Sequence, residues 1–251
     1  METDVTFFAL AIPAVLFAGI SKGGFGSAAS FAAAPMMALI LEPAEAVAVL
    51  LPLLMVMDFA GLKPYWRQWD PRTSRVLIAG GVPGMCLGAT LITVTNPDVF
   101  RLLIGLISLG FVVYQVSRNR GWLHRQKRVM SDRMGLIFAV AAGFTGFVAH
   151  AGGPVAAVYM LSKPLTKLEY QATTVFAFWA TNLVKFTLYV MIGLLTWSTA
   201  FAGLYLVPVA LIGTYLGVYL HRIVPEALYF TLIYVFLIAA GTKLIFFDAL
   251  I

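Results

Sequence analysis

Charged residues are scarce in this chain of 251 residues, and their scarcity indicates its class. Asp, Glu, Lys and Arg together make up 11% of the sequence, whereas a typical soluble domain carries about 25%. Hydrophobic residues make up 61%, and the mean hydropathy is +0.92. This composition excludes a soluble globular enzyme, a disordered chain and a nucleic-acid-binding module. We therefore expect an integral membrane protein in contact with lipid and without a nucleic-acid partner.

Cysteine is almost missing as well, because Cys86 is the only one in the sequence. One cysteine cannot form an internal disulfide or supply a metal cluster, so we expect no metal and no other cofactor. A Walker motif is also absent, which argues against a process driven by ATP. The first residues, Met1–Val5, hold no Lys or Arg. Because a secretory signal begins with basic residues, we expect the first apolar segment to be retained.

The apolar runs that remain are nearly continuous, as in Ala227–Ile238. Strands of an outer-membrane barrel would instead alternate apolar and polar residues. A helix needs about 20 apolar residues to cross the bilayer core. The predicted full spans are Ala46–Leu62, Val76–Val94, Asp98–Ser117, Tyr170–Leu195, Ala200–Leu220 and Ala227–Phe247.

Two further apolar stretches are too long for one helix, and each is interrupted. Ser21–Gly26 (SKGGFG) interrupts Val5–Leu41, and Ala149–Pro154 (AHAGGP) interrupts Gly135–Leu161. Glycine makes the backbone flexible, and proline cannot donate a backbone hydrogen bond. At membrane depth a broken helix is tolerated only where protein or a water-filled cavity covers its free backbone groups. We therefore predict that each stretch forms a V-shaped broken helix.

The basic residues predict which ends of the spans face the cytoplasm. Arg118–Arg133 holds six Lys and Arg residues, and Lys63–Arg75 holds four. The positive-inside rule places both segments in the cytoplasm. The spans between them then require Gly135–Leu161 to start and return inside, and Val5–Leu41 to start and return outside. This orientation predicts a multi-pass protein of the cell inner (plasma) membrane.

The two halves of the chain also resemble each other. The matches, which keep the same order, are Val82-Pro83 with Val207-Pro208, Gly88 with Gly213, Pro97 with Pro225 and Gly26 with Gly153. We expect an all-α membrane protein, a polytopic helical bundle with two inverted repeats, each a V-shaped broken helix plus three transmembrane helices. The repeats would be residues 1–117 and 134–251, joined by a basic cytoplasmic linker over 118–133. Alternatively, any two apolar chains punctuated by Gly and Pro align this well.

The tip of each V would begin a new half-helix near the middle of the membrane. The start of a helix has unpaired N–H groups and a partial positive charge, which suits an anion. Gly24, Phe25 and Gly26 would present such groups in the first half. Gly152 and Gly153 would do so in the second. Alternatively, these glycines only permit close packing between helices.

Each tip also carries a polar side chain. Lys22 at the first tip would be a counter-charge for an anionic substrate, because a buried ammonium needs a partner or a wet cavity. Alternatively, the first arm is shorter and Lys22 reaches the membrane interface. His150 at the second tip would titrate near neutral pH and couple protons to transport. The alternative is a neutral histidine that is hydrogen-bonded in the core.

Three more polar residues lie inside predicted spans. Lys185 lies mid-span, and Asn182 precedes it by one turn on the same face. Asp58, in the first half, falls at the position equivalent to Lys185 when the tips are aligned. We therefore predict that Asp58 and Lys185 form an ion pair. Alternatively, Lys185 faces the substrate and Asp58 balances its charge.

The residues around both breaks resemble the signatures of a known family. Ala18-Gly19-Ile20-Ser21-Lys22-Gly23-Gly24-Phe25-Gly26, with Pro35 following, resembles the first signature of the sulfite exporter TauE/SafE family. Gly143-Phe144-Thr145-Gly146-Phe147, with His150, Gly152, Gly153 and Pro154, resembles the second. The resemblance covers nearly the whole chain. It implies a polytopic transporter of sulfite, organosulfonates or related sulfur-containing anions.

We therefore expect a secondary transporter of small anions that works by alternating access and holds its substrate between the two tips. The predicted substrate-binding residues are Lys22, Gly23, Gly24, Phe25, Gly26, His150, Gly152, Gly153, Asn182 and Lys185. Asp58 is predicted to belong to a charge pair, and His150 to couple transport to protons. The sequence leaves open whether the chain forms a homo-oligomer.

Two other functions are kept as alternatives. The first is an anion channel, which would conduct its ion without dependence on a counter-ion. The second is an intramembrane enzyme, in which Ser21 or Ser27 would be a nucleophile and His150 its base. A contact between serine and histidine with geometry suited to attack would support the enzyme.

Overall fold

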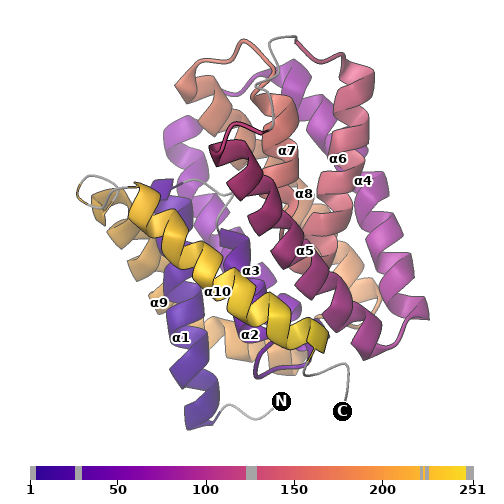
Figure 1. Cartoon of the computed structure of the whole chain (residues 1–251), viewed down its shortest axis with the longest axis vertical. Coiled ribbons are helices and arrows are strands. Elements are labelled where there is room, and N and C mark those ends of the chain that lie inside the picture. Colours follow the sequence, from indigo (N-terminus) through magenta and orange to yellow (C-terminus); the bar gives the residue numbers. More distant parts are fainter. Residues whose placement is uncertain (1–3, 26–29, 123–128, 221–222, 224–225, 247–251) are drawn as a thin grey trace.

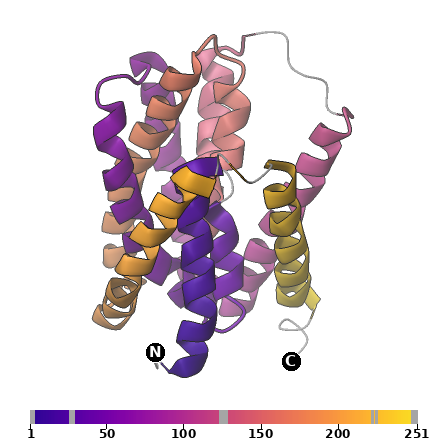
Figure 2. The same ribbon diagram turned by 90° about the vertical axis from the view of Figure 1, so that its left-hand side faces the viewer.

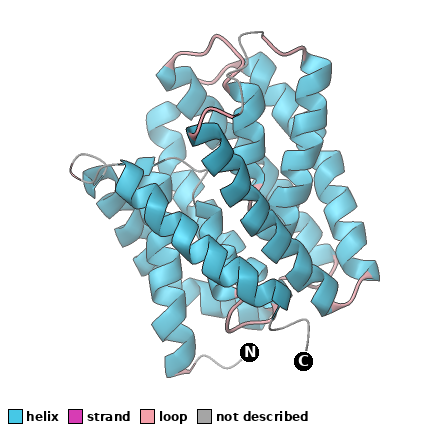
Figure 3. Cartoon of the chain, in the orientation of Figure 1, coloured by secondary structure: helices cyan, strands magenta, loops and turns pink. Residues whose placement is uncertain are grey.

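The computed structural model describes residues 4–25, 30–122, 129–220, 223 and 226–246, and within them the regular structure is entirely helical (Figure 3). The helices form one bundle (Figure 1). The α-helices are α1 Val5–Ile20, α2 Ala33–Met37, α3 Pro43–Leu62, α4 Pro71–Val94, α5 Pro97–Asn119, α6 Asp132–Ala149, α7 Gly152–Met160, α8 Lys167–Met191, α9 Trp197–Leu220 and α10 Glu226–Phe246. Three short helical turns accompany them, namely η1 Ser21–Phe25, η2 Ser30–Ala32 and η3 Lys63–Tyr65.

Seven described helical segments are long and apolar enough to cross a membrane, so the predicted all-helical membrane class is confirmed. Several helices begin earlier than the predicted spans because of how their first turns are made. Pro43, Pro71 and Pro97 each stand at the start of a helix, where a missing N–H costs no hydrogen bond. The side chain of Asp70 also accepts from the N–H of Thr73 and caps α4.

Both predicted breaks are present, and each reverses the direction of the chain. After α1, the π-helical turn η1 ends the first arm, and η2 and α2 form the returning arm. After α6, His150 adopts a left-handed conformation with φ of 54°, and α7 returns alongside α6. In Figure 1, α1 rises from the lower end of the bundle and α6 descends from the upper end. The two hairpins therefore enter from opposite ends.

The loops gather at two ends of the bundle. At the basic end, the upper end in Figure 1, Asp132 links Arg72 and Lys163 across three helix ends. At the terminal end, α1 begins and α10 ends, and Arg101 donates to Glu42 at 2.8 Å. Helix α10 lies beside α5 on one side of the bundle (Figure 2). Residues 123–128 of the predicted linker, and also Gly26, Ser27 and Pro225, lie outside the described residues.

Two helix crossings depend on glycine. Where α4 crosses α6, a Cβ on Gly84 would lie 2.0 Å from the carbonyl oxygen of Val140, and one on Gly143 would lie 2.1 Å from that of Gly81. Since real Cβ atoms do not approach an oxygen so closely, any larger residue would push the two backbones apart. Small residues of this kind permit close helix packing within membranes.

A second crossing, between α1 and α9, has the same construction. A Cβ on Gly213 would lie 2.6 Å from the carbonyl oxygen of Leu16, and one on Gly19 would lie 2.8 Å from that of Ala210. Each broken helix is therefore held by its longer arm against a helix of the other half. Together, the two crossings position both tips.

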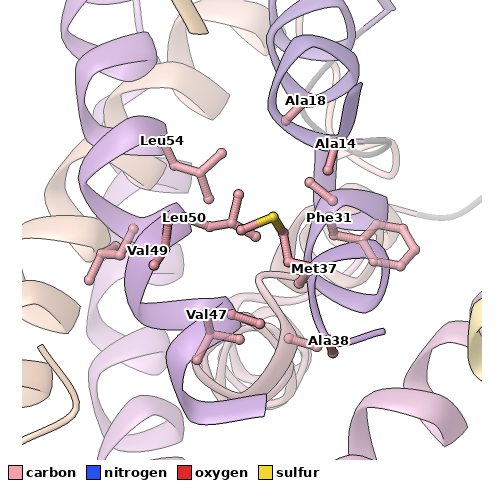
Figure 4. Close-up of a cluster of buried hydrophobic side chains, with 14 of the residues drawn as sticks. Ala14, Ala18, Phe31, Met37, Ala38, Val47, Val49, Leu50 and Leu54 are labelled. Carbon is pink, nitrogen blue, oxygen red and sulfur yellow. The ribbon is translucent and has the colours of Figure 1, made fainter. Parts of the chain in front are cut away.

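Apolar packing holds the first hairpin against α3 (Figure 4). Leu50 of α3 points toward Met37 of α2, and Ala14 and Ala18 line the adjoining face of α1. These side chains are almost fully buried. Burial of a large aliphatic side chain contributes about 1.5–3 kcal/mol, so this core fixes the first break in place.

We expect Gly84→Ala to destabilise the protein and Gly110→Ala to leave its stability unchanged. The added methyl group of Gly84→Ala must displace the backbone of α6, and overpacking of this kind costs about 1–3 kcal/mol. At Gly110 of α5 a Cβ would meet nothing within 4 Å. Thermal unfolding in detergent measures both variants. Equal unfolding midpoints for the two variants would show that α4 and α6 can move apart at this crossing without loss of stability.

Candidate functional site

A cavity of about 60 Å³ lies between the two broken helices. Both tips contribute to its wall, together with α3, α4, α6 and α8. Most lining residues are small or apolar, and the polar ones are Lys22, Ser30, His150, Thr181, Asn182 and Lys185. A water molecule needs roughly 10–15 Å³ of such space. The cavity therefore has room for a few waters or for one small ion.

Lys22 reaches the cavity from η1 and is held by two acceptors on α3. Its ammonium forms an ion pair with Asp58 and donates to the carbonyl oxygen of Leu54 at 3.1 Å. The amide of Asn182 donates to the other oxygen of Asp58 at 2.7 Å. The predicted pairing of Asp58 with Lys185 is therefore wrong. The first tip folds against α3 and brings Lys22 to the carboxylate, which the alignment of the two halves did not reveal.

Lys185 is the second buried cation of the site. Its Nζ donates to the carbonyl oxygen of Gly146 at 2.7 Å and contacts His150 Nδ1 at 2.9 Å. His150 Nε2 lies 2.9 Å from the carbonyl oxygen of Val47. Because a carbonyl only accepts, Nε2 carries the proton, and Nδ1 then accepts from Lys185. The network therefore holds a neutral imidazole.

This geometry bears on the enzyme alternative. Both ring nitrogens of His150 are engaged, one by Lys185 and the other by Val47. Neither is left to take a proton from Ser21, and Ser27 lies outside the described residues. The contact between serine and histidine that an intramembrane nucleophile needs is therefore not formed by Ser21.

The second tip provides the start of a helix. Gly152 and Gly153 are the first residues of α7 and both line the cavity. Ala151 precedes them, and its side chain cannot cap the helix. The first N–H groups of a helix lack acceptors within it, and they carry a partial positive charge. Pro154, which follows, has no N–H to leave unpaired.

The first tip is built differently. Gly23, Gly24 and Phe25 belong to η1, so they end the first arm, and the next helix begins beyond them. The expected half-helix therefore does not start at these residues. A Cβ on Gly23 would lie 2.0 Å from the carbonyl oxygen of Thr214, so Gly23 serves the close packing of η1 against α9. The backbone of Gly26 is not among the described residues.

Two polar residues of the wall were missed by sequence reasoning. Ser30 begins η2 and Thr181 lies on α8, and both line the cavity. Thr181 could have been found, because it precedes Lys185 by four residues and so shares its helical face. Nothing in the sequence marks Ser30, since its position depends on how the first break folds.

A polar cluster covers the basic end above the cavity. Asp132 accepts from Arg72 Nε at 2.6 Å, from Lys163 Nζ at 3.0 Å and from the Tyr159 hydroxyl at 3.0 Å. Partial burial acts to lower the pKa of Lys163, but hydrogen bonds with Asp132 and Tyr159 outweigh it and raise that pKa. Lys163 therefore stays charged at neutral pH.

A layer of apolar side chains separates this cluster from the polar part of the cavity. Leu77, Ala139, Ala156 and Ala177 are buried together with Tyr159 and also line the cavity. They come from α4, α6, α7 and α8, and Asp132 and its partners join the ends of the first three of these helices. The basic end of the cavity is thus closed by apolar packing beneath an ion-paired cluster.

Comparison with known proteins agrees with this architecture. No curated protein and no solved structure is significantly similar to the chain. The family model of the sulfite exporter TauE/SafE matches residues 11–244, a range that includes both breaks and every residue of the cavity. The resemblance seen in the sequence is thereby confirmed. The chain belongs to the sulfite exporter TauE/SafE family, and it is a multi-pass membrane transporter of sulfur-containing anions and not an enzyme.

Proposed function

We propose that this protein is a secondary transporter that carries sulfite, an organosulfonate or a related small anion across the cell inner membrane by alternating access. The observation that carries the proposal is the convergence of two lysine ammoniums and a helix start on one buried cavity. A lysine at membrane depth costs at least about 2.5–3.5 kcal/mol. Two lysines that face one cavity are explained by a negatively charged ligand.

The hydrogen bonds leave donors available to that ligand. Lys22 donates to Asp58 and Leu54, and Lys185 donates to Gly146 and His150. An ammonium has three N–H donors, so each lysine retains one for an anion. The N–H groups at the start of α7 add two more. In this arrangement, Asn182 and His150 hold the charged groups in position, and Gly23, Gly24 and Phe25 position Lys22.

An inverted repeat is supported by the two glycine crossings. Gly84 meets the residue three places before Gly143, and Gly213 meets the residue three places before Gly19. Helices α4 and α6 therefore cross as α9 and α1 do, and the counterpart of Gly213 in these contacts is Gly84 and not Gly88, with which the sequence comparison matched it. If α3 corresponds to α8 and α9 corresponds to α4, the contact between α3 and α9 should have a counterpart between α8 and α4. Both contacts are present. We assign the repeats to residues 1–117 and 134–251, with 118–133 as a cytoplasmic linker.

Alternating access follows from this arrangement. Rocking of one repeat against the other would open the cavity at one end while closing it at the other. Among the described residues, apolar side chains pack beneath Asp132 at the basic end, which supports a state that is closed at that end. We place that end in the cytoplasm because its loops are basic. Asp132 would then have to release its partners whenever the anion enters or leaves on this side.

We expect Lys185→Met to reduce sulfite flux into proteoliposomes strongly, and Lys243→Met to leave it unchanged. A hydrogen bond to a charged group contributes roughly 1.5–3 kcal/mol, so binding should weaken about tenfold to a hundredfold. Lys243 is a matched control, because it contacts Leu39 at the terminal end, away from the cavity. Wild-type flux in Lys185→Met would remove Lys185 from the site.

Preloading separates a carrier from a channel. If the site faces one side at a time, unlabelled sulfite inside proteoliposomes should accelerate uptake of labelled sulfite. A channel would show no such acceleration, and its flux would follow the membrane potential alone. The same vesicles with and without a pH gradient test whether protons are coupled to transport, and they require no variant.

Asp132→Asn should make the cavity more accessible from the basic end. The change removes the charge that holds Arg72 and Lys163. The measurement is the labelling rate of Ala156→Cys by a membrane-impermeant thiol reagent, in a background where Cys86 is replaced by serine. Asp98→Asn, which disrupts a surface pair with Arg101, is the control. Unchanged labelling in Asp132→Asn would show that the cluster does not restrain this end.

A further inference from the structure

The charged groups around the cavity do not cancel. Counted at their usual charges, Lys22 and Lys185 contribute two positive charges to the described residues of the site and Asp58 contributes one negative charge, while the hydrogen bonds of His150 are those of a neutral imidazole. The N–H groups at the start of α7 are dipoles and add no net charge. One positive charge is therefore left over when the cavity holds no ligand.

We propose that this single excess charge makes the site selective for monoanions over dianions, and that Asp58 is the residue that sets the selectivity. The inference rests on the proposed function and names the charge class of the substrate. Hydrogen sulfite and a sulfonate without a further acidic group carry one negative charge, whereas sulfate and fully deprotonated sulfite carry two. A monoanion neutralises the site, but a dianion leaves a buried negative charge without a partner, which is strongly unfavourable.

The surroundings of Asp58 hold its carboxylate in place. The carboxylate is 4% exposed, and both of its oxygens are engaged, one by Lys22 and the other by Asn182. These contacts come from different elements, η1 and α8, so the carboxylate cannot turn away when a ligand binds. Asp58 itself does not line the cavity. It therefore acts through Lys22 as a positioning residue and lowers the charge available to the ligand.

Burial makes the balance of charge decisive. Lys185 is also 4% exposed, so little water reaches the groups that hold the ligand. In such surroundings charges are weakly screened, and an unpaired charge cannot be compensated by solvent. Selection between anions of equal size then depends on their charge more than on any single hydrogen bond.

Methanesulfonate and sulfate provide the test, because both are small tetrahedral anions and they differ by one unit of charge. Each competes with labelled sulfite for uptake, and the ratio of their inhibition constants is independent of expression level. In the wild type we expect methanesulfonate to compete better by on the order of tenfold or more. In Asp58→Asn, where two positive charges remain, the ratio should fall by a similar factor or reverse.

A variant that replaces both partners tests charge separately from contact. Lys22→Met combined with Asp58→Asn removes both members of the ion pair and leaves the same net charge as in the wild type, carried by Lys185. We expect weaker overall competition, because one donor is lost, but the wild-type preference for methanesulfonate. If Asp58→Asn does not fold, Thr181→Lys raises the charge of the cavity and leaves the Asp58 pair intact. Thr181→Met is its control of similar length, and only the lysine variant should gain sulfate competition.

The outcomes separate this inference from the proposed function. Sulfite transport with equal competition by both anions in the wild type would overturn the selectivity and leave the transporter standing. So would an unchanged ratio in both Asp58→Asn and Thr181→Lys. If no sulfur-containing anion is transported or competes in the wild type, the proposed function itself fails.

Discussion

The structure depends on the need to compensate two lysine ammoniums in an apolar interior. Lys22 meets this need through Asp58, and Lys185 meets it through a backbone carbonyl and a neutral histidine. These bonds join η1, α3, α6 and α8 around one cavity. Isolated buried charges would be costly, so the network can form only when both hairpins are in place. The complete site therefore requires both halves of the chain to be in place.

Close helix packing makes the broken helices possible. Backbone groups freed by a break must be covered by protein or by a wet cavity. The glycine crossings of α4 with α6 and of α1 with α9 bring the long arm of each hairpin against the other half, and the tips then meet in the interior. In this arrangement each tip also contributes residues to the wall of the cavity. The two breaks therefore belong both to the packing of the bundle and to the candidate site.

The two tips are related but chemically unequal. The second offers the start of a nine-residue helix, whereas the first ends in a π-helical turn that presents a lysine. A dipole and an ammonium act on an anion in different ways, because the dipole adds directional donors and the ammonium adds net charge. Asp58 then reduces that net charge. In the proposed function, the start of α7 therefore supplies the hydrogen-bonding geometry, whereas Lys22 and Asp58 determine the charge.

Composition and periodicity alone determined the helical membrane class, the long spans and both breaks, because hydrophobic length and glycine or proline interruptions are local properties of the chain. The sequence also predicted that one site contains Lys22, His150, Asn182 and Lys185, because few polar residues lie within the apolar spans. Only the tertiary structure decided which of them touch. Asp58 pairs with Lys22 and not with Lys185, and Ser30 and Thr181 join the wall. Those choices depend on how the first tip folds onto α3, and a contact between distant segments leaves no periodic signal in either one.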